Sequence, residues 1–324
     1  MNHFSRTSLL LACLLLNVTA SQSQTNRRLA MDYLNRGTKE LEAGNLDLAL
    51  THFNHAIELD HNYSAPWFSR GLVRKRQADY AGAISDFTRS IELSPMAEAY
   101  LDRGATRKDQ GDRDGAIADY NKAIEINPGY ADAFYNRAIV LDDQGDYQRA
   151  IADFTRAIEL GPANARAFVG RGLARMHQHD ADGALTDYSK AIELNPSSFL
   201  AFFNRSFARR QKGDFEGAIA DLNKGLEINP ADADAWFERG ILRGAKSDLD
   251  GALADYAKTI ELNPKNARAY ANRGLILLLR RQDAAAQKEF DNALRIDGSL
   301  KTDLQKSIDQ IIKARQVPPA GRRP

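Results

Sequence analysis

The sequence has almost no cysteine, almost no net charge and no apolar run long enough to cross a membrane as a helix. Its one cysteine is Cys13, which excludes a disulfide framework within the chain. A formal charge of +1 gives no electrostatic case for nucleic acid or for an anionic membrane surface. The apolar segment Leu9–Leu16 is too short to span a bilayer. These absences favour a chain held together by packing and by local ion pairs.

The N-terminal segment 1–20 has the layout of a secretory signal peptide. Arg6 is followed by the uncharged Leu9–Leu16, and Val18-Thr19-Ala20 then gives a small-residue ending. We therefore expect a signal peptide over 1–20, a short disordered leader over 21–27, and export to the bacterial periplasm or the medium. Cleavage would remove Cys13, so that no disulfide stabilises the mature chain. One alternative is a disordered or membrane-associated leader. Another is a lipoprotein anchored through Cys13, although Leu14-Leu15-Leu16 continue the apolar run past that cysteine.

The sequence is rich in one motif of 14 residues that recurs about every 34 residues. It reads GAIADYNKAIEINP at 115–128, RAIADFTRAIELGP at 149–162 and GALTDYSKAIELNP at 183–196. A fixed period of this length predicts a stacked repeat architecture, which presents one long surface suited to binding. The prolines that close the motif keep the same interval: Pro95, Pro128, Pro162, Pro196, Pro230 and Pro264.

Each repeat predicts two helices. The first ends near a glycine such as Gly111, Gly145 or Gly213, where a left-handed cap needs no Cβ. The second shows the 3.6-residue apolar period and stops at Asn-Pro, because proline disfavours helix at the residue before it. An aspartate directly after the first helix is expected to accept hydrogen bonds from the start of the second: Asp79, Asp112, Asp146, Asp180, Asp214 and Asp248.

This pattern resembles the tetratricopeptide repeat, which has an aromatic residue early in helix A, a small residue mid-helix and a terminal proline. The aromatic position holds Tyr33, Trp67, Tyr100, Phe134, Phe168, Phe202, Trp236 and Tyr270. The small position holds Gly37, Gly71, Gly104, Ala138, Gly172, Ser206, Gly240 and Gly274. The resemblance implies an all-α fold, a right-handed superhelical solenoid of antiparallel helix pairs. We expect eight repeats over 28–298, a capping helix over 299–315 and a disordered tail over 316–324.

An arginine precedes each small residue, and an acid recurs in the second helix of every repeat but the first. Because these side chains flank the contact between antiparallel helices, we interpret them as a partly buried ladder of bidentate ion pairs. The alternative is a row of arginines that binds an anionic ligand. The pairs in question are Arg70 with Asp86, Arg103 with Asp119, Arg137 with Asp153, Arg171 with Asp187, Arg205 with Asp221, Arg239 with Asp255, and Arg273 with Glu289.

Helix A is expected to line the concave groove with two apolar rows and some neighbouring asparagines. Such side chains either pack between helices or bind an apolar, extended or helical segment of a partner. The candidate partner-binding residues are Phe68, Leu72, Tyr135, Asn136, Ile139, Leu173, Phe203, Asn204, Phe207, Phe237, Ile241 and Asn272. Some family members hold a C-terminal carboxylate with lysines and asparagines, but Leu34 and Thr38 occupy corresponding positions in the first repeat, so no such clamp is predicted.

The basic clusters and the histidine pair are weaker candidates for functional sites. Basic clusters at the ends of the first helices complement the helix dipole, although the segment Arg74–Lys108 remains a candidate patch for an acidic partner. His52 and His55 have a spacing that zinc can use, but no aligned carboxylate or cysteine accompanies them, so no metal site and no cofactor are predicted. No motif for a nucleophile or a phosphate loop is present, and no catalytic residue is assigned.

These observations predict an exported, non-catalytic scaffold or adaptor that binds a protein or peptide segment in its groove. We expect no nucleic-acid partner and no stable membrane insertion after signal cleavage. The alternative function is an assembly factor for an envelope enzyme or for a complex that handles polysaccharide, which would use aromatic stacking instead.

Overall fold

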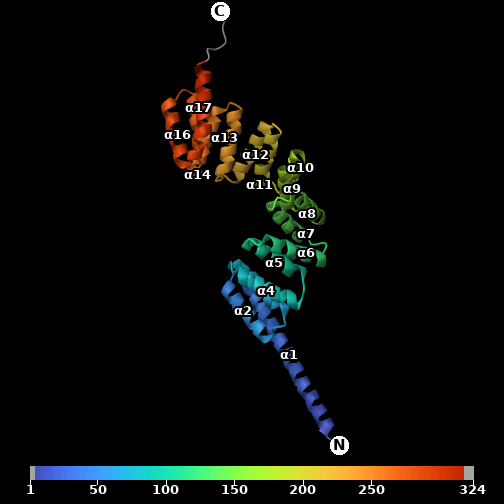
Figure 1. Cartoon of the computed structure of the whole chain (residues 1–324). Helices are drawn as coiled ribbons and strands as arrows, with labels where there is room; N and C mark the ends of the chain where they lie inside the picture. The colour runs from blue at the N-terminus through green and yellow to red at the C-terminus, as the bar shows by residue number, and fades with distance from the viewer. Residues whose placement is uncertain (1–3, 317–324) are drawn as a thin grey trace, which may run out of the picture. The chain divides into compact units, whose positions relative to one another are not determined.

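The structure is a computed structural model that describes residues 4–316, with side chains from residue 22 onward. Over this range the chain is helical and contains no strand, as the repeat pattern predicted. No helix among these residues is long and apolar enough to cross a membrane. The chain divides into two compact units, unit 1 at Met1–Pro162 and unit 2 at Ala163–Pro324, which are coloured blue to green and green to red in Figure 1.

Unit 1 is a stack of four antiparallel helix pairs. Each odd-numbered helix corresponds to the first helix of a repeat and packs on the even-numbered helix that follows it. The bounds are α1 (Phe4–Glu42), α2 (Leu46–Leu59), α3 (Ser64–Arg76), α4 (Tyr80–Leu93), α5 (Ala97–Gln110), α6 (Arg113–Ile126), α7 (Ala131–Asp143) and α8 (Tyr147–Leu160).

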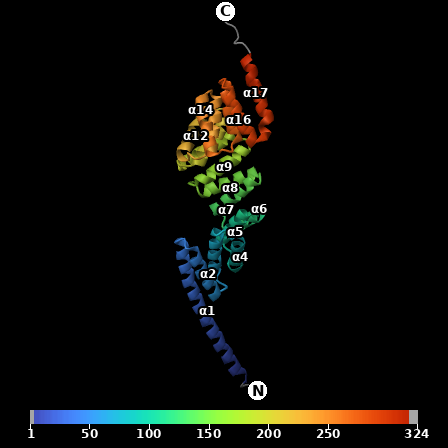
Figure 2. The ribbon, with the colours of Figure 1, turned by 90° about the vertical axis from the view of Figure 1, so that its left-hand side faces the viewer.

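Unit 2 repeats this arrangement and adds one further helix at its end. Its paired helices are α9 (Ala165–His177), α10 (Ala181–Leu194), α11 (Phe199–Gln211), α12 (Phe215–Ile228), α13 (Ala233–Ala245), α14 (Leu249–Leu262), α15 (Ala267–Leu279) and α16 (Asp283–Ile296). A 3-10 turn, η1 (Gly298–Leu300), leads into α17 (Lys301–Gln316). Figure 2 shows α17 beside α16.

The structure corrects the prediction for the segment after the expected signal peptide. Residues 21–27 belong to the continuous helix α1 and are not a disordered leader. A helix that has nucleated extends at little cost, and no glycine or proline interrupts the sequence before Gly37. Arg27 also anchors the segment, because its Nη1 lies 2.8 Å from Asp60 Oδ2 and its guanidinium lies 3.7 Å from the centre of the Tyr63 ring.

Two predicted segments are not tested by these contacts. The side chains of the expected signal peptide, residues 1–20, lie outside the described residues. Nearly all of the expected disordered tail, residues 317–324, lies outside them too, while Gln316 is the last residue of α17.

The mid-helix small residues let the two helices of a repeat approach closely. A Cβ atom added to Gly240 would come within 2.7 Å of the Tyr256 ring, and one added to Gly71 within 2.7 Å of the Phe87 ring. No real side chain tolerates such a contact, so these glycines set the distance between helices. The predicted role of the small row is confirmed.

The turn between the two helices of a repeat requires a left-handed residue, and the chain does not always supply glycine there. Gly111, Gly145 and Gly213 have φ angles of 93°, 82° and 79°, as their positions predicted. At the equivalent turns, four other residues adopt the same strained region, with φ between 60° and 64°: Ala78, His179, Ser247 and Arg281. This conformation costs a residue with a Cβ about 1–2 kcal/mol.

The aspartates after these turns cap the second helices. Asp79 Oδ1 accepts from the backbone N–H of Gly82 at 3.0 Å, and Asp214 Oδ1 accepts from that of Gly217 at 2.9 Å. The same contact is made by Asp112, Asp146, Asp180 and Asp248, so the predicted capping role is confirmed at every one of these positions.

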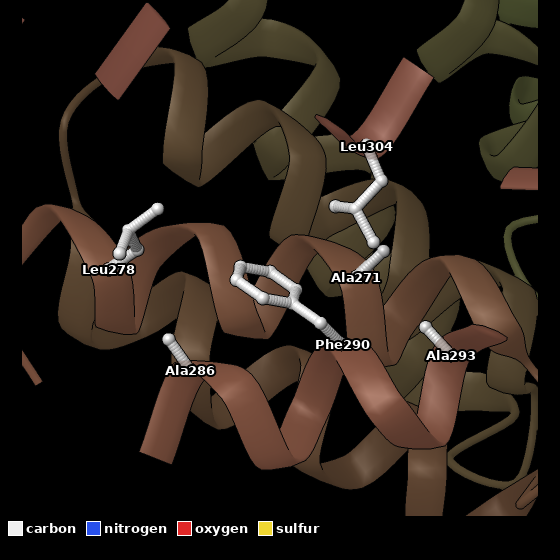
Figure 3. Close-up of a cluster of buried hydrophobic side chains, with 6 residues drawn as sticks. All are labelled: Ala271, Leu278, Ala286, Phe290, Ala293 and Leu304. Atoms are coloured by element: carbon white, nitrogen blue, oxygen red, sulfur yellow. The ribbon is translucent and has the colours of Figure 1, made fainter. Parts of the chain in front are cut away.

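Helix α17 caps the apolar end of unit 2. Its Leu304 joins a buried cluster with Leu278 of α15 and Phe290 of α16 (Figure 3). Ile308 and Ile311 of α17 pack on the same cluster. A solenoid exposes the apolar face of its last repeat unless another element covers it. Helix α17 supplies that cover, as the sequence predicted.

Candidate binding groove

The predicted ladder of ion pairs is present and is bidentate in its six Arg–Asp pairs, while Arg273 Nη2 donates to Glu289 Oε2 at 2.7 Å. In the pair between Arg239 and Asp255, for example, Nε donates to Oδ2 at 3.0 Å and Nη2 donates to Oδ1 at 2.7 Å. The aspartates are almost fully buried, so their guanidinium partners are needed to offset desolvation. In the first repeat, which has no acid at this position, Arg36 lies 5.5 Å from the centre of the Tyr33 ring, a contact that the paired arginines such as Arg239 also make with the aromatic residue three positions before them.

Several ladder arginines also join neighbouring repeats. The remaining nitrogen of Arg70 donates to Asn54 Oδ1 in the preceding helix at 2.7 Å, and that of Arg239 donates to Asn223 Oδ1 at 2.7 Å. Arg103 reaches Thr88 in the same way. Such a guanidinium fixes three helices at once, which favours the structural interpretation over a row of ligand-binding arginines.

A second arginine, four positions after the first, was not assigned to the ladder by the sequence analysis. Arg107 Nη1 donates to Asp119 Oδ2 at 2.8 Å, and Arg243 makes the same contact with Asp255 at 3.0 Å. The signal was available, because arginine recurs at this position in five repeats: Arg74, Arg107, Arg175, Arg209 and Arg243. Leu141 replaces it beside Asp153, whose ladder partner is Arg137 alone among the described residues.

These contacts pair most cations of the candidate acidic-partner patch at Arg74–Lys108 within the chain, while Arg76 donates to the Leu41 carbonyl. Arg74 and Arg107 are bound to ladder aspartates, Lys75 lies 3.6 Å from Asp102, and Lys108 lies 3.4 Å from Asp109. Cations already paired within the chain offer little further attraction to an acidic surface. The same holds for the cluster in α11, where Arg209 binds Asp221 and Arg210 binds Glu238.

An aromatic stripe runs along α11 in unit 2. Phe199 and Phe203 stack with ring centres 5.4 Å apart, and Phe203 meets Phe207 edge-on at 5.0 Å. The Arg210 guanidinium lies 4.9 Å from the centre of the Phe207 ring. Side chains four positions apart on a helix share one face, so the stripe presents a continuous apolar wall.

Two adjoining cavities lie beside this wall. The first, about 410 Å³, is lined by Phe203 and Phe207 of α11 and by Phe237 of α13. The second, about 400 Å³, is lined by Phe237 and Ile241 of α13, by Asn272 of α15 and by α17. The cavities share Phe237, Glu238 and Arg268, so they form one groove, which we call the unit 2 groove.

The unit 2 groove brings together Phe203, Phe207, Phe237, Ile241 and Asn272 from the predicted site. Leu173 on α9, 36% exposed, and Asn204 on α11 line neither cavity. One wall of the groove was not predicted from the sequence: η1 contributes Leu300, and α17 contributes Asp303, Leu304 and Ser307. Helix α17 was predicted only as a cap.

The predicted residues of unit 1 are partly exposed side chains on α3 and α7. Phe68 of α3 packs on the Phe87 ring with centres 5.7 Å apart, and Tyr135 of α7 meets the Phe154 ring edge-on at 5.8 Å. Their inner edges therefore belong to the core, while part of each side chain stays open to solvent. The other predicted residues of this unit are Leu72, Asn136 and Ile139.

Leu72 of α3 and Asn136 and Ile139 of α7 are all partly exposed to solvent. None of the three lines either cavity of the unit 2 groove. Of the predicted site, the unit 2 groove therefore contains Phe203, Phe207, Phe237, Ile241 and Asn272.

Each asparagine of the predicted site stands 16 residues after a tyrosine, which belongs to the second helix of the preceding repeat. Asn272 Nδ2 donates to Tyr256 Oη at 3.4 Å, a long contact. Tyr120 and Tyr188 precede Asn136 and Asn204 at the same spacing in the sequence. Burial raises the pKa of Tyr256 to about 12, so the hydroxyl stays protonated at neutral pH.

The charged residues of the unit 2 groove are not equally paired. The Arg210 guanidinium contacts the Glu238 carboxylate at 2.5 Å, and burial raises the pKa of Glu238 although Arg210 opposes the shift. Asp303 lies 3.3 Å from Lys306. Arg268 and Asp234 have no ion pair or hydrogen bond between their side chains and any described residue.

The histidine pair of the first repeat is placed against an aromatic ring. Tyr33 lies 6.0 Å from His52 and 5.2 Å from His55 between ring centres, and His55 Nδ1 lies 3.3 Å from Glu58. Among the described residues, no group of three potential ligands is arranged to hold a metal ion.

Comparison with known proteins identifies the family. Models described as tetratricopeptide repeat match residues 135–199 and 256–288, and a model described as TPR repeat matches 104–142 and 207–247. The helix pairs, the small-residue contacts and the terminal prolines agree with those matches. The chain is a tetratricopeptide repeat protein.

Solved structures share the fold of this tetratricopeptide repeat protein at low identity. A tetratricopeptide repeat protein from Parabacteroides merdae gives a TM-score of 0.57 at 18% identity, covering 77% of this chain and 99% of that one. A repeat protein from Cytophaga hutchinsonii gives 0.60 at 18% identity, covering 74% and 98%. YrrB, described as a TPR protein with an unusual peptide-binding site, gives 0.51 at 24% identity, covering 61% and 98%.

Curated relatives match only a short part of the chain. Human tetratricopeptide repeat protein 36 is 36% identical over 73 residues, which are 22% of this chain and 38% of that protein. The mouse protein is 37% identical over 59 residues, or 18% and 32%. The chain thus spans about a third of the length of each relative.

Proposed function

We propose that this chain is a non-catalytic scaffold that binds a segment of another protein in the unit 2 groove. The observation that carries the proposal is the pair of adjoining cavities around Phe203, Phe207 and Phe237. Half-buried aromatic rings beside an open cavity offer a partner a large apolar area, and such anchors usually dominate binding energy. The likeness to YrrB, itself described as having a peptide-binding site, supports a peptide or protein ligand.

The same residues also contribute to packing, which affects how the proposal is tested. Phe203 packs on the buried cluster of Ala218 and Leu222, and Phe237 packs on the cluster of Tyr256 and Ile276. Their truncation therefore lowers stability as well as binding. Phe215 of α12 packs on the same cluster as Phe203 but lines neither cavity, so it provides a matched control.

The lining of the groove supports the non-catalytic part of this proposal. Phe203, Phe207, Phe237 and Ile241 give the groove a mostly apolar wall. Ser307 donates its hydroxyl to the Asp303 carbonyl within α17. Such a lining is suited to binding an apolar segment.

Export is part of the proposal. Support comes from the order of Arg6, Leu9–Leu16 and Val18-Thr19-Ala20, which is that of a signal peptide. The chain without residues 1–20 would contain no cysteine, so its fold would be insensitive to an oxidising compartment.

The test is affinity capture from a cell-envelope extract with the wild-type chain and three variants. Phe203→Ala and Phe237→Ala should each weaken capture of the partner by about 2 kcal/mol, while Phe215→Ala should leave it unchanged. Circular dichroism must show all three variants folded. Protease treatment of the extract should abolish capture. Capture that resists protease but is lost after glycosidase treatment would replace this proposal with the polysaccharide alternative.

A further inference from the structure

Two charged side chains of the unit 2 groove make no ion pair or hydrogen bond within the described chain, although both act electrostatically on the neighbouring Glu238. Arg268 of α15 lines both cavities, and Asp234 of α13 lines the cavity beside Phe203 and Phe207. Both side chains are exposed, and neither has an ion pair or hydrogen bond with a described residue. The other charges of the lining, Arg210, Glu238 and Asp303, are paired within the chain.

The two unpaired charges occupy the same position in successive first helices. Asp234 is the second residue of α13, and Arg268 is the second residue of α15, one repeat further along the chain. Both side chains line the same cavity, and the axes of neighbouring helices in a helical stack are on the order of 10 Å apart. An extended chain advances about 3.3 Å per residue, so this separation corresponds to about three residues of a bound segment.

We propose that the unit 2 groove selects segments that carry an acidic and a basic side chain about three residues apart, flanked by apolar side chains. The acidic side chain binds the Arg268 guanidinium, and the basic side chain binds Asp234. The apolar side chains fill the two cavities on either side of Phe237. The inference rests on the proposed function, because it assumes that the groove binds a protein segment.

Charge complementarity gives specificity here more than affinity. Arg268 and Asp234 are exposed, and an exposed ion pair changes binding by about two- to fivefold at most. The apolar anchors supply most of the binding energy, while a segment with the wrong charges meets an unpaired like charge. Charge reversal at Arg268 or Asp234 should therefore change which peptides bind, while truncation of the apolar anchors should abolish binding.

The test is selection from a phage-displayed library of random peptides, with the purified full-length chain as bait. The enriched peptides should contain an acidic and a basic residue about three positions apart, among apolar residues. With Arg268→Glu as bait, the acidic residue should be replaced by a basic one. With Asp234→Lys as bait, the basic residue should be replaced by an acidic one. The bait Lys265→Glu, an exposed cation of the preceding turn that lines neither cavity, should select the same peptides as the wild type.

Peptides synthesised from the enriched set make the test quantitative. Replacing their acidic residue by glutamine should weaken binding to the wild type about two- to fivefold and leave binding to Arg268→Gln unchanged. Enrichment that shows no charge pattern, or a pattern unchanged by Arg268→Glu, would overturn the inference. If peptides without a charge pattern are enriched on the wild type but not on the bait Phe203→Ala/Phe237→Ala, the groove binds peptides without charge selection, and the proposed function stands while this inference fails. A library that yields no enriched peptide contradicts both.

Discussion

Removal of a ladder aspartate should destabilise the protein in proportion to the number of arginines left unpaired. Asp119 accepts three charge-assisted hydrogen bonds, at 3.0 and 2.6 Å from Arg103 and at 2.8 Å from Arg107. Asp153, in the next repeat of the same unit, accepts two from Arg137, both at 2.7 Å. Their side chains are 3% and 11% exposed.

The magnitudes follow from these contacts. Breaking a buried pair by removing one partner costs about 3–5 kcal/mol, because the remaining charge stays buried. Asp153→Ala should therefore cost about 3 kcal/mol, at the low end, since its site is more exposed and one guanidinium is stranded. Asp119→Ala should cost about 5 kcal/mol, at the high end, because two guanidiniums lose their partner. The double variant Arg137→Met/Asp153→Leu should cost less than Asp153→Ala alone.

Urea unfolding followed by circular dichroism measures these differences, and the slope of each transition reports whether the same surface unfolds. Repeat arrays can lose two-state behaviour, so the comparison is restricted to variants with unchanged slope. Equal costs for Asp119→Ala and Asp153→Ala would show that the second arginine contributes nothing. An Asp153→Ala variant with wild-type stability but no partner binding would identify the ladder as a ligand site.

Three further results are expected. Glycine should raise the free energy of unfolding by about 1 kcal/mol at each turn residue with φ between 60° and 64°, in the variants Ala78→Gly, His179→Gly and Ser247→Gly. Gly111→Ala should lower it. Thermal unfolding measures the direction of each change. Glu238→Gln should raise the thermal midpoint at pH 7 but not at acidic pH. Burial raises the pKa of Glu238 above its unfolded value, so the ionised carboxylate lowers the stability of the folded protein at pH values above that pKa. This loss of stability disappears at lower pH, where Glu238 is protonated. A higher thermal midpoint of Glu238→Gln that persists at acidic pH would contradict this cause. Finally, N-terminal sequencing of protein from the cell envelope should find Ser21 first, and recovery of an intact Met1 from the cytosol would exclude export.

Periodic features could be predicted from the sequence because each is repeated with the same physical cause. The helix pairs, the capping aspartates and the contact between Gly240 and Tyr256 all depend on residues at fixed spacing within one repeat. The ladder partners could also be predicted, since an arginine and an acid such as Arg239 and Asp255 recur together at one spacing.

Features that depend on one copy could not be predicted in this way. The unit 2 groove exists because α11 alone carries Phe199, Phe203 and Phe207 in line and because α17 closes one side of a cavity. Periodicity says which face of a helix a residue occupies, but not which neighbouring side chain leaves space beside it. The helical state of residues 21–27 was missed because a polar composition was taken for disorder, although Arg27 has a distant partner in Asp60.

Photo-crosslinking from the unit 2 groove tests the central claim most directly. A benzophenone-bearing phenylalanine at position 237 replaces a ring that lines both cavities, and the same group at position 228 replaces Ile228, an exposed residue that lines neither. Irradiation of living cells should produce a discrete, protease-sensitive adduct from position 237 and not from position 228. An adduct from position 228 alone, or no protein adduct from position 237, would contradict partner binding in the groove.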